Sequence, residues 1–227
     1  MALSRSEIVS KLNQVPTFAV VNSERQLMPV LLPTLSAGEG GEGGEEEVVA
    51  WFTDPSDAKG ALALAKLRHP GVQLQLGVTH LGSAFALAAG WTPSNSAHPL
   101  RLQPSQLLQS SFKDTLMTQL QAMRIEQTSW IMPIFSCEEL QSSSMLPVFL
   151  SRADLAATWV AAGRSKETLP DTVTVVDLRV LVERMMTDSF DWSKVRLIAS
   201  ESAIELAQGA KQVSTNADPL DEPPPLQ

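Results

Sequence analysis

The feature that most constrains the fold is a strand-then-helix pattern that recurs after about 97 residues. An apolar stretch ending in Phe52 leads into an expected helix start at Asp54, and a stretch ending in Phe149 leads into one at Ser151, 97 residues further on. In both helices an acid follows three residues after the cap, where free backbone N–H groups and the helix dipole favour negative charge. The pattern indicates two copies of one structural unit.

Two further pairs of expected helix starts keep this spacing within one residue: Thr79 with Asp177, and Pro104 with Ser200. The first strands match with a larger offset, because Pro16 and Pro133 lie 117 residues apart. The excess falls where the first copy carries a loop of glycine and glutamate. An insertion in a surface loop costs little loop-closure entropy, so the mismatch is compatible with duplication.

We therefore expect an α/β (α+β) fold that is internally duplicated, with two similar sheet-and-helix halves related by a pseudo-two-fold axis. The first half is predicted to span residues 1–111 and the second residues 112–211, with opening helices over 4–13 and 112–127. The strand at 72–78 alternates between apolar residues and glutamine. Such alternation predicts that helices cover one face of each sheet and leave part of the other face available.

Two segments are predicted to be disordered, because their compositions bury nothing: the acidic Gly/Glu loop 36–47 and the acidic, Pro-rich tail 212–227. These segments carry the equivalent of the whole net charge of −8, so the remaining globule is neutral. A neutral globule argues against nucleic-acid binding, which requires a basic face. No apolar run reaches the roughly 18 residues of a transmembrane helix, and no secretory or transit peptide is recognisable at Met1. We expect a soluble chain that is cytosolic, already processed or derived from an incomplete gene.

No catalytic centre, metal site or cofactor site is expected. Cys137 precedes two glutamates, which raise rather than lower a thiol pKa, so we expect an inert thiol. His80 follows a strand at the start of a helix, a place where active-site residues often lie. Its expected counterpart in the second half is Leu178, a packing residue, so we interpret His80 as structural. The alternative is an enzyme that uses strand-end residues near His80 and Asp177.

Five apolar residues near the junction of the halves are candidates for binding varied apolar segments of other proteins: Trp91, Met117, Met123, Trp130 and Met132. Flexible methionines beside aromatic rings suit adaptable binding. The preferred interpretation is structural, because large apolar residues at helical spacing usually lie in a core and here would hold the halves together.

Several segments, in this order, resemble a known family: "VPTFAVVN", "AWFTDPSDAKGALALAK", "LQLGVTHLGSAFAL", "MPIFSCEEL", "LPVFLSRADLAATWV", "VTVVDLRVLVERM" and "VRLIASESAIELA". The family is named for the twenty-two-kilodalton component of the translocon at the chloroplast inner envelope membrane (Tic), and it includes cyanobacterial relatives. The resemblance covers residues 4–208. The family's strand motif maps to Pro16 and Phe18 and to Pro133 and Phe135, in structural roles.

The resemblance implies a duplicated α/β fold and a soluble or peripheral protein of the plastid intermembrane space, or of the cyanobacterial periplasm. It implies a chaperone-like role in protein import, with unfolded or precursor proteins and translocon subunits as partners, and no catalytic residues. An architectural subunit of an envelope complex is the alternative. The Gly/Glu insertion departs from the family pattern and would shield or extend one apolar pocket.

Overall fold

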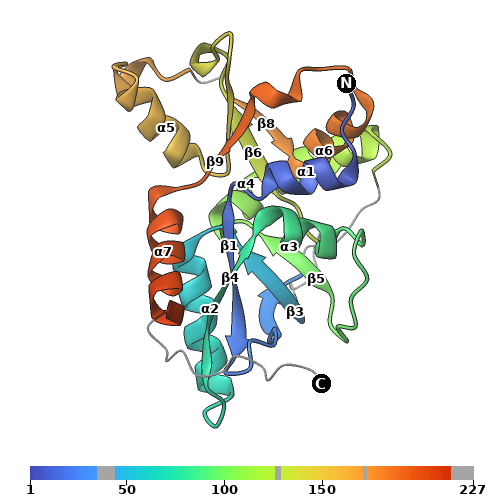
Figure 1. The fold of residues 1–227 in the computed structure, drawn as a ribbon, viewed down its shortest axis with the longest axis vertical. Coiled ribbons are helices and arrows are strands. Elements are labelled where there is room, and N and C mark those ends of the chain that lie inside the picture. Colours follow the sequence, from blue (N-terminus) through green and yellow to red (C-terminus); the bar gives the residue numbers. More distant parts are fainter. Residues whose placement is uncertain (35–43, 126–128, 171–172, 216–227) are drawn as a thin grey trace, which may run out of the picture.

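The computed structural model of the chain describes residues 1–34, 44–125, 129–170 and 173–215. It is a mixed α/β structure with two sheets (Figure 1). The first sheet contains β1 (Pro16–Asn22), β2 (Val30–Pro33), β3 (Glu45–Phe52), β4 (Leu74–His80) and β5 (Leu100–Gln103). The second contains β6 (Pro133–Ser136), β7 (Leu146–Phe149), β8 (Thr174–Asp177) and β9 (Val195–Ile198). The α-helices are α1 (Arg5–Leu12), α2 (Pro55–Arg68), α3 (Leu81–Ala88), α4 (Gln106–Ala122), α5 (Arg152–Ala161), α6 (Leu178–Thr187) and α7 (Glu201–Thr215).

The two sheets have the same strand pairing. Strand β1 is antiparallel to β3 and β4, and β3 is parallel to β5; in the same way β6 is antiparallel to β7 and β8, and β7 is parallel to β9. The registers also agree: Phe18 faces Phe52 where Phe135 faces Phe149, and Pro16 faces His80 where Pro133 faces Asp177. Strand β2, paired with β3, has no counterpart among the described residues of the second sheet.

Most predicted helix starts are confirmed. Ser4 forms a capping box with Glu7 at the start of α1, and Asp54 and Ser151 cap α2 and α5 with their side chains. The prediction for Thr79 is wrong, because β4 runs through His80, which is the N-cap of α3 and forms no side-chain cap bond. The register makes Asp177, rather than Leu178, the counterpart of His80.

Each sheet is covered on its outer face by two helices, the first by α2 and α7 and the second by α4 and α5 (Figure 1). One apolar cluster joins strands β1 and β3 to residues of α2 and α7, such as Ala58 and Ala203. The outer face of the second sheet packs against α5 and α4 in two further clusters. Helix α4, which spans the predicted boundary between the halves, therefore covers the second sheet, and α7, the last described helix, covers the first.

The inner faces share one core. A single cluster of buried residues contains Trp51 and Leu102 from the first sheet and Val148 and Leu197 from the second. Helices α1, α3 and α6 contribute to the same cluster. The prediction that one face of each sheet stays partly available is therefore wrong for the central strands, since β1 is buried from Phe18 to Val21 on both faces.

Three predicted boundaries also change. The boundary at 111/112 falls inside α4, a single helix in place of a short helix followed by one at 112–127. Residues 45–47 of the expected disordered loop belong to β3, and residues 212–215 of the expected tail belong to α7. Residues 35–43 and 216–227 lie outside the described residues.

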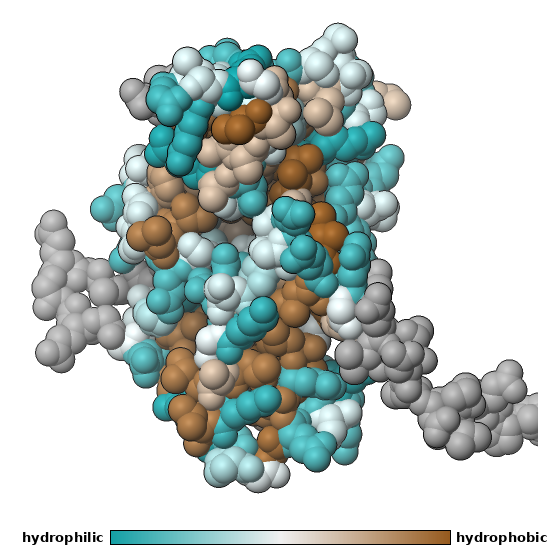
Figure 2. Space-filling model, turned by 90° about the vertical axis from the view of Figure 1, so that its left-hand side faces the viewer, coloured by the Kyte–Doolittle hydropathy of each residue, from teal (hydrophilic) through white to brown (hydrophobic). Residues whose placement is uncertain are grey.

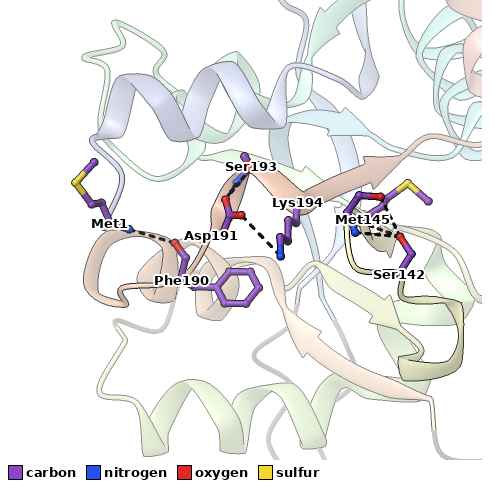
Figure 3. A network of polar contacts seen from close by, with 8 residues as sticks. Met1, Ser142, Met145, Phe190, Asp191, Ser193 and Lys194 are labelled. Carbon is purple, nitrogen blue, oxygen red and sulfur yellow. Dashed lines mark hydrogen bonds and ion pairs between the residues drawn. The ribbon is translucent and has the colours of Figure 1, made fainter.

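The N-terminal segment is fastened to the second half. The amino group of Met1 donates to the carbonyl of Phe190 at 3.2 Å, and the Leu3 N–H donates to the Met185 carbonyl at 2.7 Å. Figure 3 shows this contact beside the turn where Asp191 accepts from Ser193 and lies 3.9 Å from Lys194. The segment before α1 is therefore fastened to the second half, whereas α1 itself packs mainly against α3 of the first half.

Candidate functional site: a groove beside helix α2

A groove of about 540 Å³ lies between α2 and the hairpin of β2 and β3. Its volume lies within the range typical of ligand-binding clefts, roughly 300–1,000 Å³. The floor is apolar and continuous with the core, through Val30, Leu32, Phe52, Ala61 and Ala65. The groove can therefore accept apolar groups against a surface that is already packed.

The second wall of the groove is built by the insertion that distinguishes the first half. Strand β2 pairs with β3 from Val30–Val48 to Pro33–Glu45, and Arg101 of β5 fixes the end of β2 by donating two hydrogen bonds to the Pro33 carbonyl at 3.1 Å. Arg101 is fully buried, whereas Arg196, its counterpart in β9, is exposed. The comparison indicates that the inserted hairpin covers a surface that stays open in the second half.

Helix α2 buries small side chains and exposes two large apolar ones. Its buried stripe consists of small residues, Ala58, Ala61 and Ala65, whereas Leu64 and Leu67 on the groove side are 62% and 79% exposed. Isolated exposed leucines are common, but two on the rim of one apolar groove form a contiguous apolar surface. Figure 2 shows apolar side chains gathered over the lower half of the face formed by α2 and α7.

The polar rim of the groove is mostly acidic. Glu45, Glu47 and Asp57 line it, together with Arg68 and His69. Burial raises the pKa of Asp57 above its usual value, although the carboxylate also accepts a hydrogen bond from the Gln106 N–H at 3.1 Å. The rim therefore favours neutral or basic segments over acidic ones.

A second hollow, of about 490 Å³, adjoins the groove at the end of β2. The two share Pro33 and Gln106, and the second is lined by Leu107 of α4, which is 75% exposed.

The five sequence-predicted binding residues do not form one surface. Trp130 and Met132 are buried, 1% and 0% exposed, in the shared core. Trp91 packs edge-on against Phe85, which packs edge-on against Trp130, with ring centroids 5.2 and 6.1 Å apart. Met117 is partly buried in a separate cluster, and Met123 at the end of α4 is 38% exposed. Trp130 and Met132 thus lie in the core, where the structural interpretation of these residues places them.

The groove residues Leu64 and Leu67 were not predicted from the sequence. The signal was present in "GALALAKL", where Ala61 and Ala65 fall on the buried helical stripe and Leu62 packs beside it, whereas Leu64 and Leu67 fall outside it. Apolar periodicity is normally read from the large residues, and here Leu64 and Leu67 lie on the exposed side.

The titratable candidates lie apart from the groove floor. The Cys137 thiol is buried, and burial together with its hydrogen bond to Glu139 raises its pKa. His80 is exposed at the end of β4. Within the described ranges, no group of three or more His, Cys, Asp or Glu residues could hold a metal ion. None of the described helices is long and apolar enough to span a bilayer.

The described geometry is that of a mixed α/β protein with two sheets. This is the fold of Tic22. The chain matches Anabaena Tic22, described as a protein-transport protein, with a TM-score of 0.59 and 17% identity over 98% of this chain and 100% of that one. It matches Tic22 from Plasmodium falciparum with a TM-score of 0.56 and 16% identity over 91% of this chain and 98% of that one. No protein-family profile and no curated protein sequence matches the chain. The resemblance noted in the sequence is confirmed at the level of the fold.

Proposed function

We propose that this protein is a chaperone-like component of protein translocation that binds apolar segments of unfolded or precursor proteins, its clients, and that it acts without catalysis. The observation that carries the proposal is the apolar groove between α2 and the inserted hairpin. The fold supports it, since one structural neighbour is Anabaena Tic22, described as a protein-transport protein.

The groove suits weak and reversible binding. Full burial of an exposed leucine side chain contributes about 2 kcal/mol. Because Leu64 and Leu67 are 62% and 79% exposed, covering both contributes about 3 kcal/mol. Association costs an estimated 4–15 kcal/mol, so further apolar contacts on the groove floor are required.

The test compares a Leu64→Asp/Leu67→Asp double variant with a matched control, Val160→Asp. Val160 lies on α5, away from the groove, and is 50% exposed. Binding of a fluorescent, permanently unfolded protein is measured by anisotropy. We expect affinity to fall at least about tenfold in the groove variant and to stay unchanged in the control. Equal binding by both variants would show that the groove is not the client site.

We also propose that the protein acts in the plastid intermembrane space, with the cyanobacterial periplasm as the alternative compartment. The fold match to a cyanobacterial protein and an apicomplexan protein supports an envelope-associated role. Protease protection of the tagged protein in isolated organelles tests the location. A permanent complex with no free monomer in a native extract would favour an architectural subunit instead.

We further infer that the two halves arose by internal duplication. The shared pairing and register support it, as do His80 and Asp177, which lie 97 residues apart, the same distance as Asp54 and Ser151. The reciprocal packing of α4 and α7 fits the same origin. A crystal structure in which β1, β3 and β4 fail to superpose on β6, β7 and β8 would contradict the inference.

A further inference from the structure

Among the described residues, no other strand pairs with the outer edge of β4. The Leu81 N–H donates to the Val15 carbonyl, and β1 and β4 pair with Thr17 facing Thr79. Antiparallel ladders alternate between bonded and non-bonded pairs, so the backbone groups of the even-numbered residues from 74 to 80 point away from β1. In the part of the chain that the structure describes, no strand or side chain pairs with these groups.

The other sheet edges carry features that prevent pairing. Strand β2 follows Pro29 and ends in Pro33, and neither proline has an N–H to donate. In the second sheet, β8 is the counterpart of β4, and its outward Val175 carbonyl accepts a hydrogen bond from Gln119 of α4 at 3.0 Å. Strands β5, β8 and β9 are also only four residues long.

By contrast, β4 has seven residues, and the stretch from 72 to 79 contains neither proline nor charge. Its residues Leu76, Gly77, Val78 and Thr79 are partly exposed, whereas the neighbouring β1 is buried. Proteins normally protect long, uncharged edges with charges, prolines or covering elements. An edge left open in this way is suited to pairing with another strand.

We propose that β4 pairs antiparallel with β4 of a second copy, so that the first sheets of two molecules form one continuous sheet across a two-fold axis. The sequence is self-complementary about Leu76: Leu76 faces its own copy, Leu74 faces Val78, and Gln73 faces Thr79. The apolar side chains of Leu74, Leu76 and Val78 thus meet apolar ones, Gln73 meets Thr79, and Gln75 lies opposite Gly77, so no two charged side chains face each other. The residues that form hydrogen-bonded pairs in this register are those whose backbone groups point outward, and about six backbone hydrogen bonds would form.

The test uses a proline that removes only an outward donor. Val78→Pro deletes the N–H that points to the partner and leaves the β1–β4 ladder intact, and Val78→Ala truncates the same side chain but keeps the N–H. Analytical ultracentrifugation of the full chain from about 1 to 500 µM gives the dissociation constants. We expect a dimer for the wild type and for Val78→Ala, and at least about tenfold weaker association for Val78→Pro. Gln75→Lys, which places a charge on the same edge, serves if Val78→Pro fails to fold, and it should also weaken the dimer.

Hydrogen exchange identifies the interface independently of these variants. The amides of Leu74, Leu76 and Val78 should exchange more slowly at high protein concentration than at low concentration. The amides of Gln75 and Gly77, which bond to β1, should not change. A wild type that stays monomeric throughout, or a dimer equally strong in Val78→Pro, overturns the proposal. Protection of the even-numbered amides only after an unfolded client is added assigns the edge to the client and also overturns it.

Discussion

The contact between α1 and α3 at Gly82 allows a sharp test of the packing. A Cβ atom added at residue 82 would lie 2.1 Å from the Val9 carbonyl oxygen and 2.6 Å from Oδ1 of Asn13. Helix α1 would have to move by about 1 Å, and overpacking of this kind costs up to about 3 kcal/mol. Alanine recovers about 1 kcal/mol through its higher helix propensity, so Gly82→Ala should lose about 2 kcal/mol.

For a chain of this length, that loss lowers the melting temperature by about 4–8 °C, which thermal unfolding followed by circular dichroism can measure. Gly209→Ala in α7 is the matched control, because nothing lies within 4 Å of an added Cβ there. The control should gain up to about 1 kcal/mol. If Gly82→Ala melts at or above the wild-type temperature, α1 and α3 do not approach as closely as described.

Three further predictions concern buried polar groups. Arg101→Met leaves the Pro33 carbonyl without the Arg101 donors and should lower the free energy of unfolding, measured in urea, by about 2–4 kcal/mol. Arg196→Met, at the exposed equivalent position, should change it by less than about 0.5 kcal/mol. Equal effects of the two substitutions would disprove the role of burial. Burial raises the pKa of Asp57, so the folded state binds its proton more tightly than the unfolded state, and this stabilisation is lost as the pH rises through the raised pKa. Asp57→Asn should therefore gain stability relative to the wild type between about pH 3 and pH 7, and a constant difference would contradict this. Because burial raises the pKa of the Cys137 thiol, a disulfide reagent at pH 8 should modify the folded protein at least about 100-fold more slowly than the unfolded chain.

Local chemistry made the helix starts predictable from the sequence. Ser4, Asp54 and Ser151 have the short polar side chains that accept bonds from free N–H groups, and all three act as caps. The failure at Thr79 has a physical reason. The backbone of β4 continues to pair with β1 through His80, and this ladder outweighs the capping preference of threonine.

Features that depend on long-range packing were not predictable. The helix break expected near residue 111 is missing, because Phe112 and Leu116 of α4 pack on the second sheet and extend one helix across the boundary. The groove was missed because it requires the inserted hairpin and α2 to lie side by side, a relation that no local pattern encodes. The placement of Trp130 in the shared core likewise depends on both halves being present.

The reciprocal placement of α4 and α7 links the folding of the halves. A fragment that ends before α5 would lose the helix that covers its own sheet, and Ala203 and Ala207 of that helix belong to the same buried cluster as Phe18 and Phe52. Neither fragment alone can complete its core, so the intact chain should unfold in a single cooperative transition. Two separately produced fragments would regain native structure only by complementing each other, as two interlocked parts of one domain.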